Sequence, residues 1–375
     1  MAHHNTILNQ MVAFLPRHDF EKLAKVHHVG HKFRTFSRWS QFMALMIGQL
    51  SGRVSLRDLV ENIATKSRRL YHLGIKSVSR SNLARANDEQ PAVLYEIMFG
   101  KLLDRCRALA PGNRFKFKGK LYLLDATMIE LCLSVFPWAK YTKSKGAVKV
   151  HVGLDANGYL PSFLSVTDGK RHEIEWAKAL QLPRGSFAVF DRGFTDYDWY
   201  ASLMKNGIFF VTRLKSNAKF RLGWKRNGRK AAGITADREI FLGDIATPLR
   251  LVEYTDPETG IDYRFVTNAS NLPAKTVADL YKERWQIELF FKWIKQNLKV
   301  KTFLGTSRNA VLTQLWVAMI VYLLLAFLKF KAKLGQSLTG ILRLLQLNLF
   351  SRRDFMSLFK LPDIQVVENR QFSLW

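Results

Sequence analysis

The sequence predicts an α/β fold in which a central region of strands and helices lies between two mainly helical regions. Short apolar runs bounded by turn residues, typical of buried strands, are concentrated in the middle of the chain. Longer stretches with apolar residues at helical spacing precede and follow them. With 375 residues, of which 48% are hydrophobic, the chain can bury a large core.

The charge of the chain is strongly positive. It contains 58 Lys and Arg against 30 Asp and Glu, a formal net charge of +28. Such an excess attracts polyanions, and the interleaved aromatic residues suit base stacking, so nucleic acid is the first partner to consider. A ribosome-associated or merely basic protein would show the same excess. Only two cysteines occur, and the first ten residues lack a signal-peptide pattern, so we expect a cytoplasmic protein without a zinc or disulfide framework.

Residues 1–112 are predicted to form a helical N-terminal DNA-binding domain. Within it, Ser55–Ile63 and Ser79–Asn87 resemble the two helices of a helix-turn-helix. In this interpretation Arg80 and Arg85 face a groove or the backbone of DNA. An ordinary helical hairpin with solvated arginines is an almost equally good interpretation, and the local sequence does not separate the two.

Two buried runs in the central region end on an aspartate. Leu121–Asp125 is the first predicted strand, and Phe187–Asp191 is the fourth. Between them, Val148–Leu154 and Tyr159–Val166 form a predicted hairpin around an Asn-Gly turn. An aspartate after a strand is usually a turn former or a helix cap, so neither residue is diagnostic by itself.

The remaining central elements complete a recognisable order. A helix at Glu173–Leu180 precedes the fourth strand, and a helix near Asp196–Asn206 and a strand at Ile208–Leu214 follow it. Residues 216–270 look strand-like and are interpreted as a β-rich insertion. Its beginning is intensely basic around Trp224, which suggests a DNA clamp with a stacking residue, or alternatively a solvated basic loop. These basic residues are Lys215, Lys219, Arg221, Lys225, Arg226, Arg229 and Lys230.

A long helix is predicted over Ala278–Val300, entered just after Pro273. At about 100° per residue, a polar stripe and an apolar stripe lie on different faces. The polar stripe around Glu288 contains Tyr281, Arg284 and Lys295, and Trp285 and Lys292 lie on its flank. The apolar stripe, expected against the core, contains Leu280, Ile287, Phe291, Ile294 and Leu298. A solvated helix with an Arg284/Glu288 pair explains part of this pattern, but not the shared position of Tyr, Arg and Lys.

The spacing Tyr281-x2-Arg284-x3-Glu288-x6-Lys295 resembles the Tyr-Arg-Glu-Lys signature of bacterial insertion-sequence DDE transposases of the family numbered four. The run Asp191-Arg192-Gly193-Phe194 resembles the family's motif around its second aspartate, and Asp125-Ala126-Thr127 is compatible with the first. The order of the central elements is that of a ribonuclease-H-like domain. The resemblance implies that the strands carrying Asp125 and Asp191 are neighbours and that Glu288 is the third catalytic carboxylate.

The resemblance also implies roles for the residues around these carboxylates. Three clustered carboxylates repel one another unless cations share the site, and their hard oxygens suit Mg²⁺ or Mn²⁺, with two ions expected. Arg284 and Lys295 are expected to clamp DNA phosphates, and Tyr281 to donate to one. Trp285 is expected either to stack an extruded base or to pack against the protein. Arg192 and Lys292 complete the predicted DNA-binding set.

The function expected from the resemblance is cut-and-paste DNA transposition. The predicted partners are the terminal inverted repeats of an insertion sequence and the target DNA, bound by a homodimer without a membrane. The predicted catalytic domain covers residues 113–310, and a C-terminal helical region covers 311–375. Two alternatives are a domesticated relative that only binds DNA and another ribonuclease-H-like nuclease. Intact carboxylates argue against the first, and the Tyr-Arg-Glu-Lys pattern argues against the second.

Overall fold

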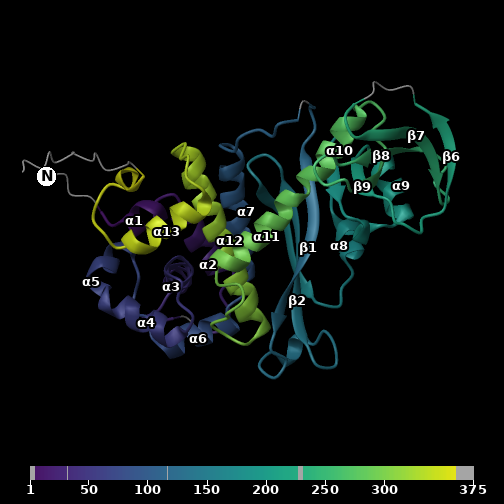
Figure 1. Cartoon of the computed structure of the whole chain (residues 1–375). Helices are drawn as coiled ribbons and strands as arrows, with labels where there is room; N and C mark the ends of the chain where they lie inside the picture. Colours follow the sequence, from purple (N-terminus) through teal and green to yellow (C-terminus); the bar gives the residue numbers. More distant parts are fainter. Residues whose placement is uncertain (1–4, 32, 116, 227–230, 360–375) are drawn as a thin grey trace, which may run out of the picture.

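A mixed sheet forms the centre of the protein. The computed structural model describes residues 5–31, 33–115, 117–226 and 231–359, and in these the sheet has nine strands in the order β3-β2-β1-β4-β5-β9-β8-β7-β6. Figure 1 shows β1 and β2 between a helical body on one side and the strands β6 to β9 on the other. The strands are β1 Leu121–Leu131, β2 Gly146–Asp155, β3 Leu160–Asp168, β4 Phe187–Phe190, β5 Phe209–Arg213, β6 Phe220–Lys225, β7 Ile234–Leu242, β8 Leu249–Thr255 and β9 Asp262–Thr267.

The helices fall into two groups, a helical body and four helices that belong to the sheet. The helical body contains α1 Ile7–Val12, α2 Arg17–Val26, α3 Arg38–Ser51, α4 Leu56–Thr65, α5 Ser67–Leu70, α6 Arg80–Glu89, α7 Val93–Arg107, α12 Arg308–Lys331 and α13 Leu338–Asn348. The sheet carries α8 Glu173–Ala179, α9 Tyr197–Lys205, α10 Ala274–Glu283 and α11 Trp285–Asn297. Short 3-10 turns are η1 Tyr71–Leu73, η2 Pro137–Ala139, η3 Arg192–Phe194 and η4 Met356–Leu358.

The first five strands have the connectivity of a ribonuclease-H-like fold, which confirms the predicted fold class. β1 pairs antiparallel with β2 and parallel with β4, and β4 pairs parallel with β5. The β-rich insertion does not form a separate sheet, because β9 pairs antiparallel with β5. The four inserted strands therefore extend the catalytic sheet on the side of β5.

Helices cover both faces of the sheet. Alternate residues of β1 and β4 point to opposite faces. One set packs in a core that also contains α11 and the helical body, and the other packs with α8 and α9. Figure 1 shows α10 and α11 crossing in front of the sheet, from the inserted strands to the helical body. The helix predicted to carry Glu288 thus lies on a defined face of the sheet.

The predicted end of the first strand is wrong. β1 continues past Asp125 to Leu131, because β2 is long enough to pair with it from Tyr122 to Leu131. β4 pairs with β1 only from Leu121 to Leu124. Asp125 therefore lies inside a strand, at the point where one of its two neighbours ends.

The single long helix predicted over Ala278–Val300 is also wrong in one respect. It begins directly after Pro273 as expected, but it is divided into α10 and α11 at Arg284. At the division the backbone N–H of Arg284 bonds to the carbonyl of Tyr281, and that of Ile287 bonds to the carbonyl of Arg284, both at 3.1 Å. These are the tighter bonds of a 3-10 turn. All five residues of the predicted apolar stripe are buried.

The helical body differs in detail from the predicted helix-turn-helix. α4 and α6 lie close to the predicted positions, and Ser55 and Ser79 accept bonds from the first turns of these helices as N-caps. However, α5 and η1 stand between them, so the connection is not a simple turn. α12 is long and apolar enough to cross a membrane, but 94% of its most apolar window is buried among the other helices in the described part of the chain.

A buried arginine fastens the insertion to the start of α10. Arg250 of β8 is 5% exposed and forms two bonds with the carboxylate of Asp237 on β7, at 2.7 and 2.8 Å. Its other nitrogen donates to the carbonyl of Leu272, just before α10. One guanidinium thus joins two inserted strands to the chain that leads into the helix.

We expect Arg250→Leu to lower the free energy of unfolding by about 3–5 kcal/mol, because Asp237 keeps a buried charge without its main partner. Urea denaturation followed by circular dichroism measures this. The double variant Arg250→Leu/Asp237→Leu removes both charges and is expected to recover most of the loss. An unchanged urea midpoint for the single variant would contradict this account of Arg250.

Candidate active site

The pairing of β1 with β4 brings the first two predicted carboxylates side by side. Leu124 and Phe190 form the last pair of this parallel register. Asp125 and Asp191 directly follow these two residues. Because paired strands lie about 4.8 Å apart, the two aspartates leave the register at the same level of the sheet.

Both aspartates are placed on the face that carries α11. Residues two and four positions before them pack in the same core as α11, and side chains alternate along a strand. These residues are Leu121 and Leu123 of β1 and Phe187 and Val189 of β4. Asp191 is fixed further by its own turn, since its Oδ1 accepts a bond of 2.8 Å from the backbone N–H of Gly193.

Arg284 connects Asp125 with the third predicted carboxylate. Its Nη2 lies 2.6 Å from Oε1 of Glu288, and its Nη1 lies 3.6 Å from Oδ2 of Asp125. The guanidinium is mostly buried, with 16% of its side chain exposed. Glu288 and Asp125 therefore face one positive group. In the described residues, no three His, Cys, Asp or Glu side chains are arranged closely enough to hold a metal ion.

The environment of Asp125 favours its neutral form. Burial, with further contributions from the negative charges of Asp191 and Glu173, raises the pKa of Asp125 to about 7. The backbone N–H of Ala126 and the charge of Arg284 act in the opposite direction. The nearby carboxylates of Asp191 and Glu173 thus contribute to the raised pKa of Asp125.

Lys295 of α11 contacts β1 two residues beyond Asp125, on the same face of the sheet. Its Nζ donates to Oγ1 of Thr127 at 2.5 Å, and Thr127 is two residues after Asp125 on β1. Burial and the neighbouring charge of Lys301 lower the pKa of Lys295, while Glu130 opposes this. The predicted stripe of Arg284, Glu288 and Lys295 therefore faces the edge of β1 that carries Asp125.

Tyr281 has a different environment from the other residues of the stripe. It is 8% exposed, and its ring packs against Phe265 of β9 with a centroid separation of 4.8 Å. The guanidinium of Arg284 lies 5.6 Å from the centre of the Tyr281 ring. Burial raises the pKa of its phenol. The Tyr281 ring therefore packs against the guanidinium of Arg284 and connects α10 to β9 of the insertion.

A buried carboxylate that the sequence did not single out holds the junction of α10 and α11. Glu283 is 6% exposed, accepts a bond of 2.5 Å from the hydroxyl of Tyr159 and pairs with Arg114 at 2.8 Å. Tyr159 lies in the turn between β2 and β3. The residue before Arg284 is thus tied to the sheet, which fixes where the guanidinium can point.

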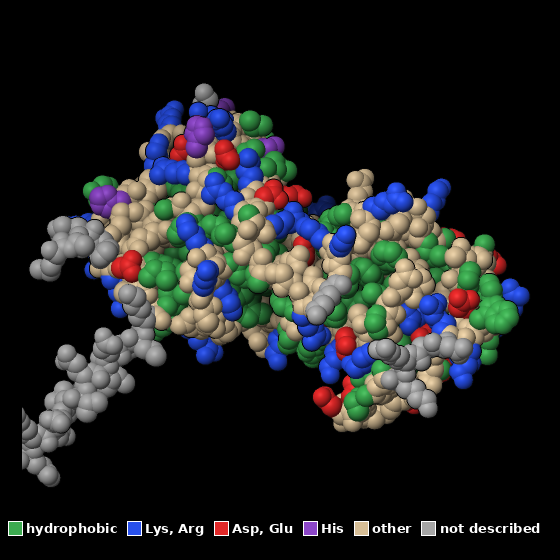
Figure 2. Space-filling view, turned by 90° about the horizontal axis from the view of Figure 1, so that it is seen from above, with side chains coloured by type: hydrophobic (Ala, Val, Ile, Leu, Met, Phe, Trp, Pro, Cys, Tyr) green, Lys and Arg blue, Asp and Glu red, His purple; other side chains and the backbone are tan. Residues whose placement is uncertain are grey.

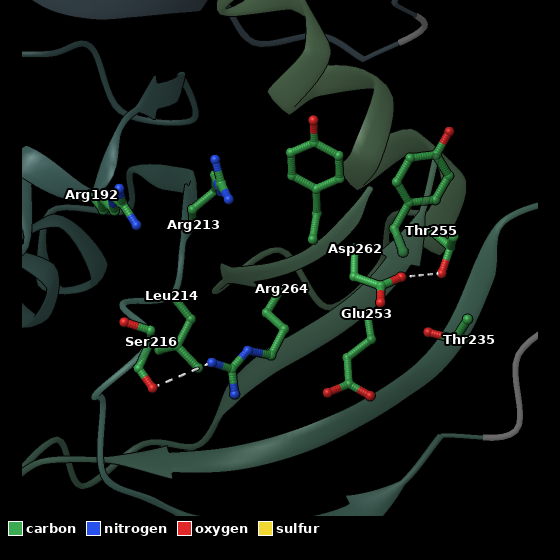
Figure 3. A pocket seen from close by; sticks show the side chains of 11 residues that line it. Arg192, Arg213, Leu214, Ser216, Thr235, Glu253, Thr255, Asp262 and Arg264 are labelled. Carbon is green, nitrogen blue, oxygen red and sulfur yellow. Dashed lines mark hydrogen bonds between the residues drawn. The ribbon is translucent and has the colours of Figure 1, made fainter. Parts of the chain in front are cut away.

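A hollow of about 520 Å³ is lined by Arg192, which directly follows Asp191 in the chain, and by Arg213 and Arg264 (Figure 3). Arg264 lies beside Glu253 and Asp262 on the inserted strands β8 and β9, while Arg192 and Arg213 lie apart from them in this view. A second hollow of about 310 Å³ shares Arg213 and two tyrosines with it and reaches Tyr281, Arg284 and Trp285. The two shared tyrosines are Tyr254 and Tyr263. The two hollows therefore form a depression rich in arginine and aromatic groups that runs from Arg192 to the beginning of α11.

The other predicted DNA-binding residues are exposed but lie at different places. Trp285 is 57% exposed on α11, and Lys292 is exposed further along the same helix. Trp224 is 84% exposed, but its strand β6 is six strand positions from β1. Arg80 and Arg85 are exposed on α6 in the helical body. Arg229 and Lys230 of the predicted basic stretch lie outside the described residues.

Sequence reasoning missed Thr127, Glu283 and Arg213. Thr127 could have been found, because a strand extended by two residues places it on the same face as Asp125. Glu283 carried no local signal, since its partners Tyr159 and Arg114 are more than a hundred residues away. Arg213 ends β5, and only the pairing of β5 with β9 shows that it reaches the depression.

Comparison with known proteins gives the family. A family model described as the transposase DDE domain matches residues 116–324, and one for a domain of unknown function, DUF4372, matches residues 3–76. A Sinorhizobium fredii protein named as a transposase, y4zB, is 33% identical over 77% of this chain and 82% of its own length. A Geobacillus stearothermophilus protein, named as a transposase for insertion sequence element IS5377, is 26% identical over 88% of this chain and 86% of its own length.

Among solved structures, a chain of the piggyBac transposase synaptic complex with hairpin DNA aligns with a TM-score of 0.46 and 13% identity, over 95% of this chain and 80% of that chain. No functional conclusion follows from a similarity of this level.

The chain belongs to the family of transposases with a DDE domain. It is a transposase of a bacterial insertion sequence, an enzyme that cleaves DNA and transfers its strands. This confirms the predicted group of bacterial insertion-sequence DDE transposases, the fold class and the reaction class, while the Tyr-Arg-Glu-Lys signature stays a prediction. Membership in this family also favours transposition over the activity of another ribonuclease-H-like nuclease.

The raised pKa of Asp125 predicts a pH-dependent stability of the metal-free protein. The folded-state pKa of about 7 lies above the usual 3.8. The folded protein therefore binds the additional proton between these two values, and this contribution to stability is lost as the pH rises through 7. We expect Asp125→Asn to be more stable than the wild type above pH 7, by roughly 2–4 kcal/mol, with the difference shrinking towards acidic pH.

Urea titrations at several pH values between about 5 and 8 measure this difference. The matched control is Asp244→Asn, because Asp244 is exposed and has no ion pair among the described residues. A pH-independent difference between Asp125→Asn and the wild type would contradict the raised pKa.

Proposed function

We propose that Asp125, Asp191 and Glu288 are the catalytic carboxylates of this transposase. The observation that carries the proposal is the position of the two aspartates at the end of the β1–β4 register, facing the helix that presents Glu288. Arg284 supports it, because this guanidinium contacts both Asp125 and Glu288. The cluster has the composition that phosphodiester chemistry needs, with acidic groups bordered by cations.

We also propose that the three carboxylates hold two Mg²⁺ or Mn²⁺ ions. The donor chemistry fits these ions, since carboxylate oxygens are hard ligands. In the described residues the three carboxylates are not close enough to hold an ion together, so they would have to approach one another when ions bind. Asp125, Asp191 and Glu288 would hold such ions, which would supply activation of a water or 3′-hydroxyl and stabilisation of the leaving oxygen. Asp125 must lose its proton to act as a ligand. Arg284 must release at least one carboxylate, and its guanidinium is then free to bind a DNA phosphate.

The residues around the carboxylates are proposed to position the DNA. Arg284 would hold a phosphate by paired bonds and Lys295 by its point charge, with Lys292 on the exposed flank of the same helix. Arg192 would contact the backbone from the other side of the site. Tyr281 is proposed to act mainly by supporting Arg284, because its ring is buried.

The exposed tryptophans are proposed as stacking residues. Trp285 borders the depression next to Arg284 and can stack a base that leaves the duplex near the cleaved end. Trp224 is too far along the sheet to reach the same base, so it is proposed to contact DNA outside the cleavage site. Arg80 and Arg85 are proposed to contact DNA from the helical body.

The proposed partners are the terminal inverted repeats of the insertion sequence and the target DNA, bound by a homodimer in the cytoplasm. We propose residues 1–112 as a DNA-binding domain, 113–310 as the catalytic domain with its insertion at about 216–270, and 311–375 as a C-terminal helical region. The strongly positive charge supports a polyanionic partner. The last residues of that region, 360–375, lie outside the described part of the chain.

We expect Asp125→Asn, Asp191→Asn and Glu288→Gln each to lower the rate of metal-dependent DNA cleavage by at least about 100-fold, because each removes a proposed metal ligand. Cleavage of labelled duplexes that carry the ends of the insertion sequence, with and without Mg²⁺, measures this. The control Asp244→Asn should cleave at the wild-type rate. Undiminished cleavage by any of the three variants would refute the role of that carboxylate.

We expect Trp285→Ala to weaken binding of DNA with an unpaired end by roughly 1–3 kcal/mol, since one stacking partner of a base is lost. Trp285→Phe should retain most of the affinity. Leu289→Ala is the matched control, because Leu289 is an apolar side chain of the same helix that is 41% exposed. Equal effects of Trp285→Ala and Leu289→Ala in fluorescence anisotropy would show that stacking is not the reason.

A further inference from the structure

Glu173 is a further carboxylate beside the proposed catalytic residues. It is the first residue of α8, and 30% of its side chain is exposed. Its Oε1 lies 3.3 Å from Nζ of Lys149 on β2. An acidic residue in the first turn of a helix and an ion pair with a lysine are common structural features, so this contact by itself assigns no role.

The second oxygen of Glu173 faces the turn that follows β4. A methyl group placed on Gly193 would lie 3.2 Å from Oε2 of Glu173 and 2.9 Å from Oδ1 of Asp191. The carboxylates of Glu173 and Asp191 thus border the same small space beside Gly193. Any side chain at position 193 would enter that space.

The backbone of the turn does not require a glycine at position 193. Positive φ angles, which favour glycine, occur at Gly185 and Gly207 but not at Gly193. An alanine would therefore suit the backbone conformation, and only the two nearby carboxylates leave too little room for its methyl group. Gly193 thus keeps the space between Glu173 and Asp191 open.

Two residues of β2 fix the position of α8. Lys149 and His151 alternate with residues that pack on the α11 face, so they point to the face that carries α8. Nζ of Lys149 also donates to the carbonyl of Arg171 at 3.1 Å. The buried ring of His151 stacks on Trp176 of α8 with a centroid separation of 5.2 Å. The first turn of α8, with Glu173, is therefore held against the sheet beside η3.

The negative charge of Glu173 reaches the proposed catalytic residues. Glu173 and Asp191 both contribute to the raised pKa of Asp125. Lys149 neutralises Glu173 through Oε1 and not through the oxygen that faces Gly193. The ion pair therefore leaves repulsion between the carboxylates at the end of the β1–β4 register. A cation bound among them would offset this repulsion.

We propose that Glu173 is a fourth metal-binding carboxylate of this transposase, acting together with Asp191. The proposal rests on the proposed function of Asp125, Asp191 and Glu288. Carboxylate oxygens are the ligands that Mg²⁺ and Mn²⁺ prefer. Oε2 is the oxygen that Glu173 offers to an ion, because Oε1 is paired with Lys149. Lys149 thus holds Glu173 beside Asp191 in the metal-free protein.

Binding of Mn²⁺ to the full-length, metal-free protein tests the proposal. Free Mn²⁺ has a sharp electron paramagnetic resonance signal that is lost on binding, so a titration gives the Kd without any reaction. The variants are Glu173→Gln and Gly193→Ala. The matched controls are Glu175→Gln and Gly335→Ala. Glu175 is an exposed carboxylate of the same helical turn that also pairs with an arginine, and a methyl group on Gly335 would meet no atom within 4 Å.

We expect Glu173→Gln to raise the Kd for Mn²⁺ at least about 10-fold, because the amide keeps the shape of the side chain but not its charge. Gly193→Ala should also weaken binding, since its methyl group enters the space between the two carboxylates. Both controls should bind Mn²⁺ like the wild type. The Mg²⁺ concentration that gives half the maximal rate of DNA cleavage should rise by a similar factor in Glu173→Gln.

Wild-type affinity for Mn²⁺ together with an unchanged Mg²⁺ requirement in Glu173→Gln would overturn the proposal, and Glu173 would then act only as the partner of Lys149. An equal loss of affinity in Glu175→Gln would also overturn it, because the loss would follow from net charge and not from a ligand. Thermal melts show whether each variant is folded.

Failure of this inference is distinguishable from failure of the proposed function. Asp125→Asn is measured in the same Mn²⁺ titration and in the cleavage assay. If Asp125→Asn loses Mn²⁺ binding and cleavage while Glu173→Gln behaves like the wild type, only the fourth carboxylate is refuted. If Asp125→Asn retains both, the proposed catalytic set is refuted, whatever the result for Glu173→Gln.

Discussion

The parallel pairing of β1 with β4 is the constraint on which the rest of this structure depends. β4 ends at Phe190, while β1 continues because β2 supports it on its other side. At that level two aspartates lie on adjacent strands, one still inside the sheet and the other leaving it. The negative charges of Asp125 and Asp191 repel each other, and burial makes the charged form of Asp125 still less favourable. The site therefore requires positive charge.

Arg284 supplies that charge in the present structure. It reaches both Asp125 and Glu288, and it occurs where the long helix is interrupted by a tighter turn. Glu283 fixes this point to the β2–β3 turn, and Tyr281 supports the guanidinium from the insertion. The interruption is thus held by contacts on both sides of it. In a continuous helix, Arg284 and Glu288 would lie at different positions relative to the end of β4.

Two further parts of the chain surround the acidic residues, the inserted strands β6 to β9 and the segment after α11. The inserted strands extend the sheet beyond β5 and bring Arg264 and a pair of tyrosines to the hollow that Arg192 and Arg213 also line. The segment after α11 is fastened by Gln314 to the helical body. Exposed Lys and Arg side chains therefore extend well beyond the carboxylates (Figure 2). Long-range attraction of the phosphate backbone follows from this distribution of charge.

The class of fold, the order of the central strands, and the acidic and basic residues of the candidate site were predictable from the sequence alone. Apolar periodicity, turn residues and the spacing of Tyr281, Arg284, Glu288 and Lys295 are local properties, and local patterns can be read without knowing the partners of each element. The catalytic role of these residues is still a prediction.

Only the tertiary structure decided how far β1 extends, where the long helix divides, and which residues support the site. The length of β1 depends on β2, the division at Arg284 is held by Tyr159 through Glu283, and the distance of Trp224 from the carboxylates follows from strand order. Each of these depends on contacts between residues far apart in the chain. Such contacts form because strand pairing and burial in the folded protein outweigh local secondary-structure preference. The local pattern of one sequence does not show how strong these long-range contacts are.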